Sequence, residues 1–127
     1  MTRPNNREIP YDIKQRTFLF ALRIVQLVGR VPRSIAGVEI GRQLLRAGTS
    51  VGSNVEEADG SVSRKDFVNH IRIARKEARE SRFWLALIEA AGLLHDPDLP
   101  ELRTEADELV RILSKIALRA GGMTNEG

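Results

Sequence analysis

The chain contains no cysteine, and this absence excludes two kinds of chemistry. Disulfide bonds cannot form, and no metal ion can be held by thiolates. A protein without disulfides suits a reducing compartment, so we expect a cytoplasmic location. Long apolar runs are also absent, and no segment approaches the roughly 18 apolar residues of a membrane span. The first ten residues, MTRPNNREIP, are polar and lack the apolar centre of a signal peptide. We therefore expect no association with a membrane.

Histidine is scarce, which limits the metal chemistry open to the chain. Only His70 and His95 occur, and neither follows a glutamate by three residues as the ligands of di-iron bundles do. Two acidic clusters lack the spacing of an EF-hand and are interpreted as solvated carboxylates: Glu56, Glu57 and Asp59, and Asp96, Asp98 and Glu101. No zinc, phosphate-loop or dinucleotide-binding signature is present. We expect no metal, no cofactor and no small-molecule substrate.

The 127 residues are enough for one domain, which we expect to span residues 1–127 with a folded core from about 10 to 121. Four segments carry the 3.6-residue period of amphipathic helices, at about 11–30, 34–58, 63–92 and 100–120. No stretch alternates with a period of two over a convincing length, and the connections are short. The pattern predicts an all-α protein that forms an antiparallel, up-down-up-down four-helix bundle.

Several residues define how these helices begin and pack. Ser63 and Asp66 have the spacing of a capping box, and Pro100 is expected to begin the fourth helix. The third and fourth helices carry heptad seams, formed by Phe67, Ile71, Ala74, Ala78, Ser81, Leu85 and Ile88, and by Leu102, Ala106, Leu109, Leu113, Ile116 and Ala120. Four glycines in the second helix are expected to let a neighbouring helix approach closely: Gly37, Gly41, Gly48 and Gly52.

The first helix is apolar over a wider arc than one core requires. Phe18, Leu22 and Val25 form a second apolar line beside its main stripe. Trp84 and Leu87 similarly lie beside the seam of the third helix. A single bundle would leave this apolar surface exposed, which monomers rarely do over a large patch. We therefore expect a closed homo-oligomer.

Two polar features of the second helix have alternative interpretations. Residues 48–52 match G-x-S-x-G, the nucleophile elbow of hydrolases, but an elbow follows a strand, whereas the residues before Ser50 have a helical period. Small residues that let helices pack are the favoured explanation, and we expect no enzymatic activity. Asn54 and Glu57 are interpreted as structural polar residues that tie the end of this helix to a neighbour or another subunit. The alternative is a functional polar site.

The third helix carries a basic stripe opposite its seam, formed by Lys65, Arg72, Arg75, Lys76, Arg79 and Arg82. At 100° per residue these six side chains fall within an arc of about 120°. The segment from Ser61 to Arg82 holds seven basic and three acidic residues, whereas residues 83–127 hold four basic and eight acidic ones. Repeated on every subunit, the stripe could neutralise several phosphates together. The alternative is a solvated helix face with pairs such as Lys76–Glu80.

Sequence-specific recognition is not expected, because no base-reading motif is visible and aromatic residues, at 5%, are too few for a base-stacking platform. RNA or DNA bound without strong sequence preference is the expected partner. If the basic stripe is not the contact, the next candidates are Arg16, Arg23 and Arg30 of the first helix.

The central part of the chain resembles the bacterial four-helix-bundle proteins first noticed as open reading frames within intervening sequences of 23S ribosomal RNA genes. The resemblance covers residues 9–120 and rests on four stretches, QLLRA (43–47), SVGSNVEE (50–57), SRKDF (63–67) and IARKEARES (73–81). It implies a four-helix bundle that assembles as a ring-shaped homopentamer, in a family without an established enzymatic activity. The fold is also similar to that of the accessory protein of diversity-generating retroelements, a nucleic-acid-binding partner of a reverse transcriptase.

Residues and resemblance together lead to one expectation. The protein is expected to be a non-enzymatic, pentameric accessory or scaffold protein that binds nucleic acid through its basic faces. The alternative is an oligomerisation or protein-interaction module that binds no nucleic acid.

Overall fold

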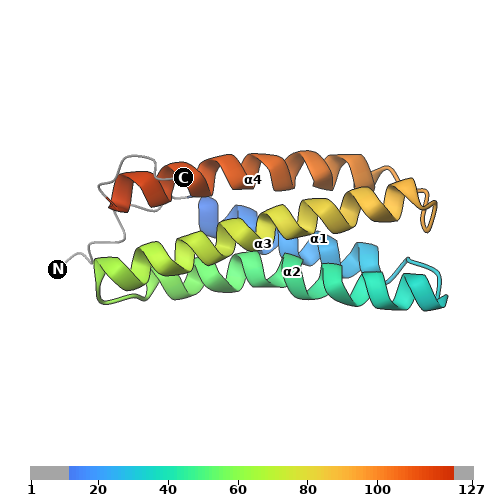
Figure 1. Ribbon diagram of the computed structural model, residues 1–127, viewed down its shortest axis with the longest axis horizontal. Helices are drawn as coiled ribbons and strands as arrows, with labels where there is room; N and C mark the ends of the chain where they lie inside the picture. The colour runs from blue at the N-terminus through green and yellow to red at the C-terminus, as the bar shows by residue number, and fades with distance from the viewer. Residues whose placement is uncertain (1–11, 122–127) are drawn as a thin grey trace.

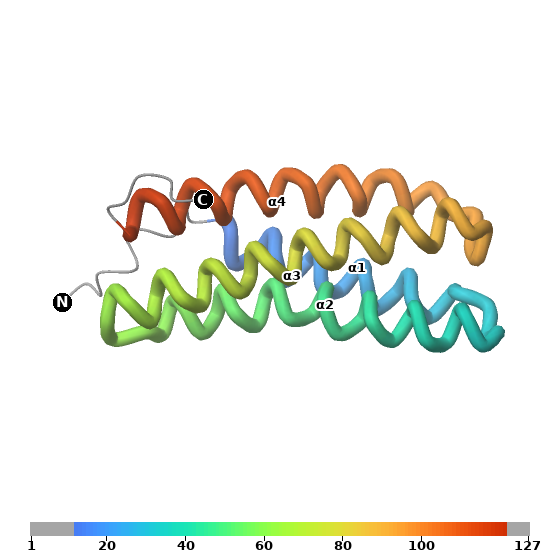
Figure 2. Tube along the Cα trace, viewed as in Figure 1, coloured from blue at the N-terminus to red at the C-terminus, as the bar shows by residue number. Residues whose placement is uncertain are grey.

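The computed structural model describes residues 12–121, which form four α-helices joined by short loops (Figure 1). The helices are α1 (Ile13–Val28), α2 (Ile35–Asp59), α3 (Arg64–Ala90) and α4 (Asp98–Gly121). Consecutive helices run in opposite directions, and α3 lies against both α2 and α4 (Figure 2). The predicted all-α, antiparallel four-helix bundle is therefore confirmed. Residue 11, the predicted start of the first helix, lies outside the described residues.

Serine side chains begin two of the helices. The Ser34 hydroxyl accepts a hydrogen bond from the backbone N–H of Gly37 at 2.9 Å, and the Ser63 hydroxyl accepts one from the N–H of Asp66 at 3.1 Å. The second bond of the predicted capping box, from the backbone N–H of Ser63 to the Asp66 carboxylate, does not form within the described chain. Aspartate is one methylene shorter than the glutamate that usually closes such a box.

The start of α4 differs from the prediction by two residues. The helix begins at Asp98, because the Asp96 carboxylate accepts the Asp98 N–H at 2.9 Å and satisfies a donor at the helix start. Pro100 lies inside the first turn, where its missing N–H removes no bond of the helix.

The core lies between all four helices and includes the two predicted seams. Every seam residue of α3 and α4 is at most 2% exposed. Ser81 is the polar member of the α3 seam, and its hydroxyl donates to the Glu77 carbonyl at 2.8 Å, so no polar atom of this side chain is left unsatisfied there. Phe20, Ile24 and Leu27 of α1 pack against these seams, and α2 adds Leu44, Val51 and Val55 to the core.

Two glycines bring α1 and α2 together. A Cβ atom at Gly48 would lie 2.8 Å from Cγ1 of Ile24, and one at Gly52 would lie 3.2 Å from the Thr17 carbonyl oxygen. The predicted close approach of a neighbouring helix is confirmed at these positions. At Gly37 the reason differs, because the nearest atom to an added Cβ, at 2.3 Å, belongs to Pro32 in the preceding loop.

Gly48→Ala is expected to lower the free energy of unfolding by about 1–3 kcal/mol, since the β-branched Ile24 has little freedom to move away from the new methyl group. Chemical denaturation monitored by circular dichroism measures the change. Gly60→Ala is the matched control, because its nearest contacts lie at 3.8 Å or more and its φ is −91°. Equal stability of the two variants would contradict the close-approach argument.

Ion pairs close the edge between α1 and α4, where helix packing is less extensive than along the other edges. Three arginines spaced seven residues apart, two on α1 and one in the loop after it, each bind two acids of α4 or of the loop before α4. The pairs are Arg16 with Glu105 and Glu108, Arg23 with Asp98 and Glu101, and Arg30 with Asp96 and Asp98. We call this set the arginine ladder.

The second apolar line of α1 is exposed as expected, with Phe18, Leu22 and Val25 at 67%, 43% and 48%. Leu45, also exposed, lies on the face of α2 that carries Gly41 and Gly48 and meets α1. The expectation for Trp84 and Leu87 was wrong, because both are half-buried within the chain. No helix in residues 12–121 is long and apolar enough to cross a membrane.

Candidate nucleic-acid interface

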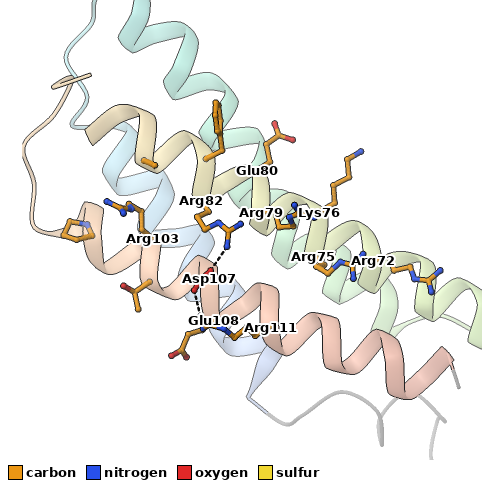
Figure 3. Close-up of a pocket in the computed structure, with 14 residues that line it drawn as sticks. Arg72, Arg75, Lys76, Arg79, Glu80, Arg82, Arg103, Asp107, Glu108 and Arg111 are labelled. Atoms are coloured by element: carbon orange, nitrogen blue, oxygen red, sulfur yellow. Dashed lines mark hydrogen bonds and ion pairs between the residues drawn. The ribbon is translucent and has the colours of Figure 1, made fainter. Parts of the chain in front are cut away.

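The basic stripe of α3 borders an open groove between α3 and α4 (Figure 3). The groove has a volume of about 1190 Å³ and contains five of the six stripe residues, from Arg72 to Arg82. Small side chains leave room between the helices, with Ala86 on α3 and Thr104 on α4. Seven cationic and three acidic side chains line it, so the groove carries a net excess of positive charge.

Lys65 lies outside this groove, nearer the start of α3. It is exposed and lines a smaller hollow of about 620 Å³ together with Arg64 and Arg72. Because Arg72 lines both hollows, the structure brings all six predicted residues along one continuous side of α3.

Acids of α4 neutralise the cations at one end of the groove. Asp107 forms ion pairs with Arg82 of α3 and with Arg111 of its own helix, the latter at 2.6 Å (Figure 3). Arg103 pairs with Glu89. Glu108 is held by Arg16 of the arginine ladder at 3.2 Å. Arg82, Arg103 and Arg16 therefore join α4 to its neighbours, and every cation at this end of the groove already has an acidic partner.

The remaining cations of the groove, Arg72, Arg75, Lys76 and Arg79, form what we call the cation quartet. None of them forms an ion pair with any residue in the described part of the chain, in contrast to Arg82, Arg103 and Arg111. Arg72, Lys76 and Arg79 are exposed, and Arg75 is half-buried on the side that faces α4.

The quartet gathers like charges at unfavourable spacings. Apart from the sequence neighbours Arg75 and Lys76, its members stand three, four or seven residues apart, so their side chains are neighbours on two consecutive helical turns. Each such like-charged pair costs an isolated helix about 0.2–0.5 kcal/mol. Within the described chain no member of the quartet forms an ion pair that would neutralise it, so an external polyanion would find cations already brought together.

Glu80 is the acid that could have neutralised the quartet, because it follows Lys76 by four residues. The Lys76–Glu80 ion pair, which belonged to the alternative interpretation of a solvated helix face, does not form in the described chain. Glu80 instead pairs with Arg46 of α2 and accepts a hydrogen bond from Trp84 Nε1 at 3.1 Å. This bond from Trp84, followed by the one from Arg46, lowers the pKa of Glu80 below its ordinary value.

The alternative cationic candidates already have acidic partners. Arg16 and Arg23 of α1 and Arg30 in the loop after it belong to the arginine ladder, and the hydrogen bonds that they donate to acidic side chains raise the pKa of each above that of a free arginine. For Arg16 the largest cause is Glu105, whose carboxylate oxygens lie 2.7 and 3.0 Å from the guanidinium nitrogens. These residues join α1 and the loop after it to α4, so the quartet is a better candidate for binding an external anion than they are.

Asn54 bridges two helices. Its amide nitrogen donates to the Ser50 carbonyl oxygen at 2.9 Å and lies 3.1 Å from the Ser50 hydroxyl, while its carbonyl oxygen lies 3.2 Å from Nδ1 of His70 on α3. An amide oxygen only accepts, so His70 Nδ1 donates this bond. Glu57 is exposed, and its backbone carbonyl accepts a hydrogen bond from the Ser61 hydroxyl at 2.9 Å.

The serine of the G-x-S-x-G match does not sit on an elbow. Residues 35–59 form one continuous helix, so no strand precedes Ser50 and no strained turn presents its hydroxyl. Small residues that let α1 and α2 pack explain the pattern, as Gly48 and Gly52 show.

The acidic clusters were expected to be solvated, and Glu56, Glu57 and Glu101 are indeed exposed. The prediction was wrong for Asp59, which is 7% exposed and binds Lys14 at 2.9 Å, whereas Asp96 and Asp98 are half-buried in the arginine ladder. The distant helix partners could not be identified from the sequence. Across residues 12–121, no group of three or more acidic, histidine or cysteine side chains is arranged to hold a metal ion.

Sequence reasoning missed Phe83, Arg103 and Arg111, which also line the groove. Phe83 could have been found, because it follows Arg79 by four residues and Lys76 by seven and so lies on the same face. Arg103 and Arg111 could not have been found in this way, because their position in the groove depends on how α4 is rotated against α3.

Comparison with known proteins identifies the family. The profile described as 23S rRNA-intervening sequence protein matches residues 10–115. A crystal structure of a protein with unknown function from the S23 ribosomal protein family of Bacteroides thetaiotaomicron VPI-5482 is similar, with 31% identity, a TM-score of 0.72 and coverage of 82% of this chain and 93% of that one. No curated protein gives a match. The chain therefore belongs to the 23S rRNA-intervening sequence protein family.

Proposed function

We propose that this protein is a non-enzymatic, homo-oligomeric accessory or scaffold protein that binds RNA or DNA through the α3–α4 groove, without strong sequence preference. The observation that carries the proposal is the cation quartet. Acidic partners neutralise the arginine ladder and the cations on the α4 side of the groove. The cation quartet, in contrast, has no ion pair in the described chain: Arg72, Arg75, Lys76 and Arg79.

A phosphate backbone fits this arrangement. Arginine and lysine side chains neutralise phosphates and release the counterions that surround them, which gives affinity without reading a sequence. Backbone contacts of this kind require a row of cations, and the quartet extends over two turns of one rigid helix. Assembly would repeat the row on each copy, so that one nucleic acid could touch several rows at once.

A second candidate function has its own supporting observation. The exposed apolar surface formed by Phe18, Leu22, Val25 and Leu45 suits contact with another copy of the chain, as in the homopentamer that the family resemblance implies. An oligomerisation module would need this surface and would not need the cation quartet. The two functions therefore differ in whether the cation quartet is needed for activity.

Binding of the wild-type protein to labelled RNA and DNA oligonucleotides, followed by fluorescence anisotropy while salt is raised, tests the proposal. The logarithm of the affinity should fall linearly with the logarithm of the salt concentration, with a slope of about −0.7 to −0.9 for each phosphate neutralised. Oligonucleotides of scrambled sequence should bind equally well. Absence of binding at low salt would end the nucleic-acid proposal and leave the oligomerisation module.

A further inference from the structure

An exposed aromatic ring lies at one end of the cation quartet. Phe83 is 57% exposed and lines the same groove as Arg79 and Arg82. In the described chain only one other aromatic side chain, Phe18, is exposed, and it belongs to the apolar surface of α1. The groove that Phe83 lines has an excess of cationic side chains, in contrast to the apolar surface that contains Phe18.

The ring of Phe83 is held in place from one side. It meets the ring of Trp84 edge-on, with centroids 4.9 Å apart and planes at 75°. Trp84 is in turn fixed by its hydrogen bond to Glu80, which Arg46 holds from α2. A positioned ring loses little conformational freedom when a planar partner stacks on it.

The spacing along α3 suits a polymer whose phosphates and bases alternate. Arg72, Lys76, Arg79 and Phe83 follow one another at intervals of three or four residues, so consecutive side chains rise by about 5–6 Å along the helix. Consecutive phosphates of an extended single strand lie at a comparable separation. Bases of a single strand are also free to stack on aromatic side chains, whereas bases of a duplex are stacked on one another and paired.

We propose that the groove selects single-stranded nucleic acid, whose phosphates lie along the cation quartet and one of whose bases stacks on Phe83. This inference rests on the proposed function and adds the form of nucleic acid that is bound. It requires that affinity depend on the presence of bases. A row of cations alone would bind a strand equally well with or without bases.

Phe83→Leu, which keeps an apolar side chain but removes the aromatic face, tests the inference, and Phe83→Tyr is the matched control. The probes are single strands of about 12 nucleotides, a duplex of equal length, and an abasic single strand of equal length. Phe83→Leu should weaken binding of the single strand by about 5- to 100-fold, while Phe83→Tyr stays near wild type. The abasic strand should bind both variants equally, and light scattering should show an unchanged mass.

A second readout needs no substitution, because Trp84 is the chain's single tryptophan and touches Phe83. Its fluorescence should change when a base-bearing single strand binds and remain constant with the abasic strand. Undiminished single-strand affinity of Phe83→Leu, tighter binding of the duplex, or an unaltered tryptophan signal would each overturn the inference while leaving the proposed function intact. Failure of wild type to bind any of the probes would instead remove the proposed function.

Discussion

Reversing two charges of the cation quartet, by Arg72→Glu together with Arg79→Glu, is expected to reduce affinity for nucleic acid by at least about 100-fold at low salt. Each substitution removes a cation from the row and places an anion beside the phosphates. The slope of the logarithm of affinity against the logarithm of salt concentration should also become shallower, by the amount that corresponds to about two lost phosphate contacts. Anisotropy titrations of wild type and variant over a range of salt concentrations measure both effects.

The fold should tolerate this double substitution, because neither arginine forms an ion pair in the described chain and both are exposed. Exposed changes of this kind usually alter the free energy of unfolding by no more than about 0.5 kcal/mol each. Arg33→Glu with Arg42→Glu is the control, since it changes the net charge equally at two exposed arginines outside the groove. If the control lost as much affinity as the quartet variant, net charge and not the groove would govern binding.

Introducing acids into the exposed apolar line of α1, by Leu22→Glu with Val25→Glu, is expected to convert the assembled protein into single chains. An apolar side chain covered by a neighbouring subunit contributes about 1.5–3 kcal/mol, and two charges buried in its place would cost considerably more. Multi-angle light scattering at micromolar concentration should therefore show several chains for wild type and one for the variant.

Val62→Glu provides the matched control for this change. Val62 is 94% exposed in the turn between α2 and α3, away from the apolar line, so the same kind of substitution should leave the mass unaltered. Circular dichroism should show equal helix content in all three proteins, because the altered side chains are exposed in the single chain. A monomeric wild type would contradict the assembly itself, and a double variant of undiminished mass would place the contact on another face.

Features that repeat along one helix could be predicted from the sequence. The α3 seam repeats every three or four residues, which is sufficient to place Phe67 and Leu85 in the core, and the serine before a helix identifies its own cap. The row from Arg72 to Arg79 is also local, because its members share one helix. These predictions required no knowledge of which helices are neighbours.

Features that join different helices could not be predicted in this way. Arg23 binds acids 75 and 78 residues away, and nothing in the local sequence distinguishes it from Arg79, which binds none. The distinction arises from the rotation of each helix against its neighbours. Phe83, in contrast, could have been predicted, because it follows Arg79 by four residues and so lies on the same face of α3.

The arginine ladder also constrains how this sequence can change over evolutionary time. Asp98 is shared by Arg23 and Arg30, so its loss would weaken two ion-pair sets at once. Glu101 and Glu108, in contrast, each bind one arginine that keeps a second acidic partner. Among related sequences we therefore expect substitutions at these two glutamates to be tolerated first, and changes at Asp98 to appear together with changes on α1.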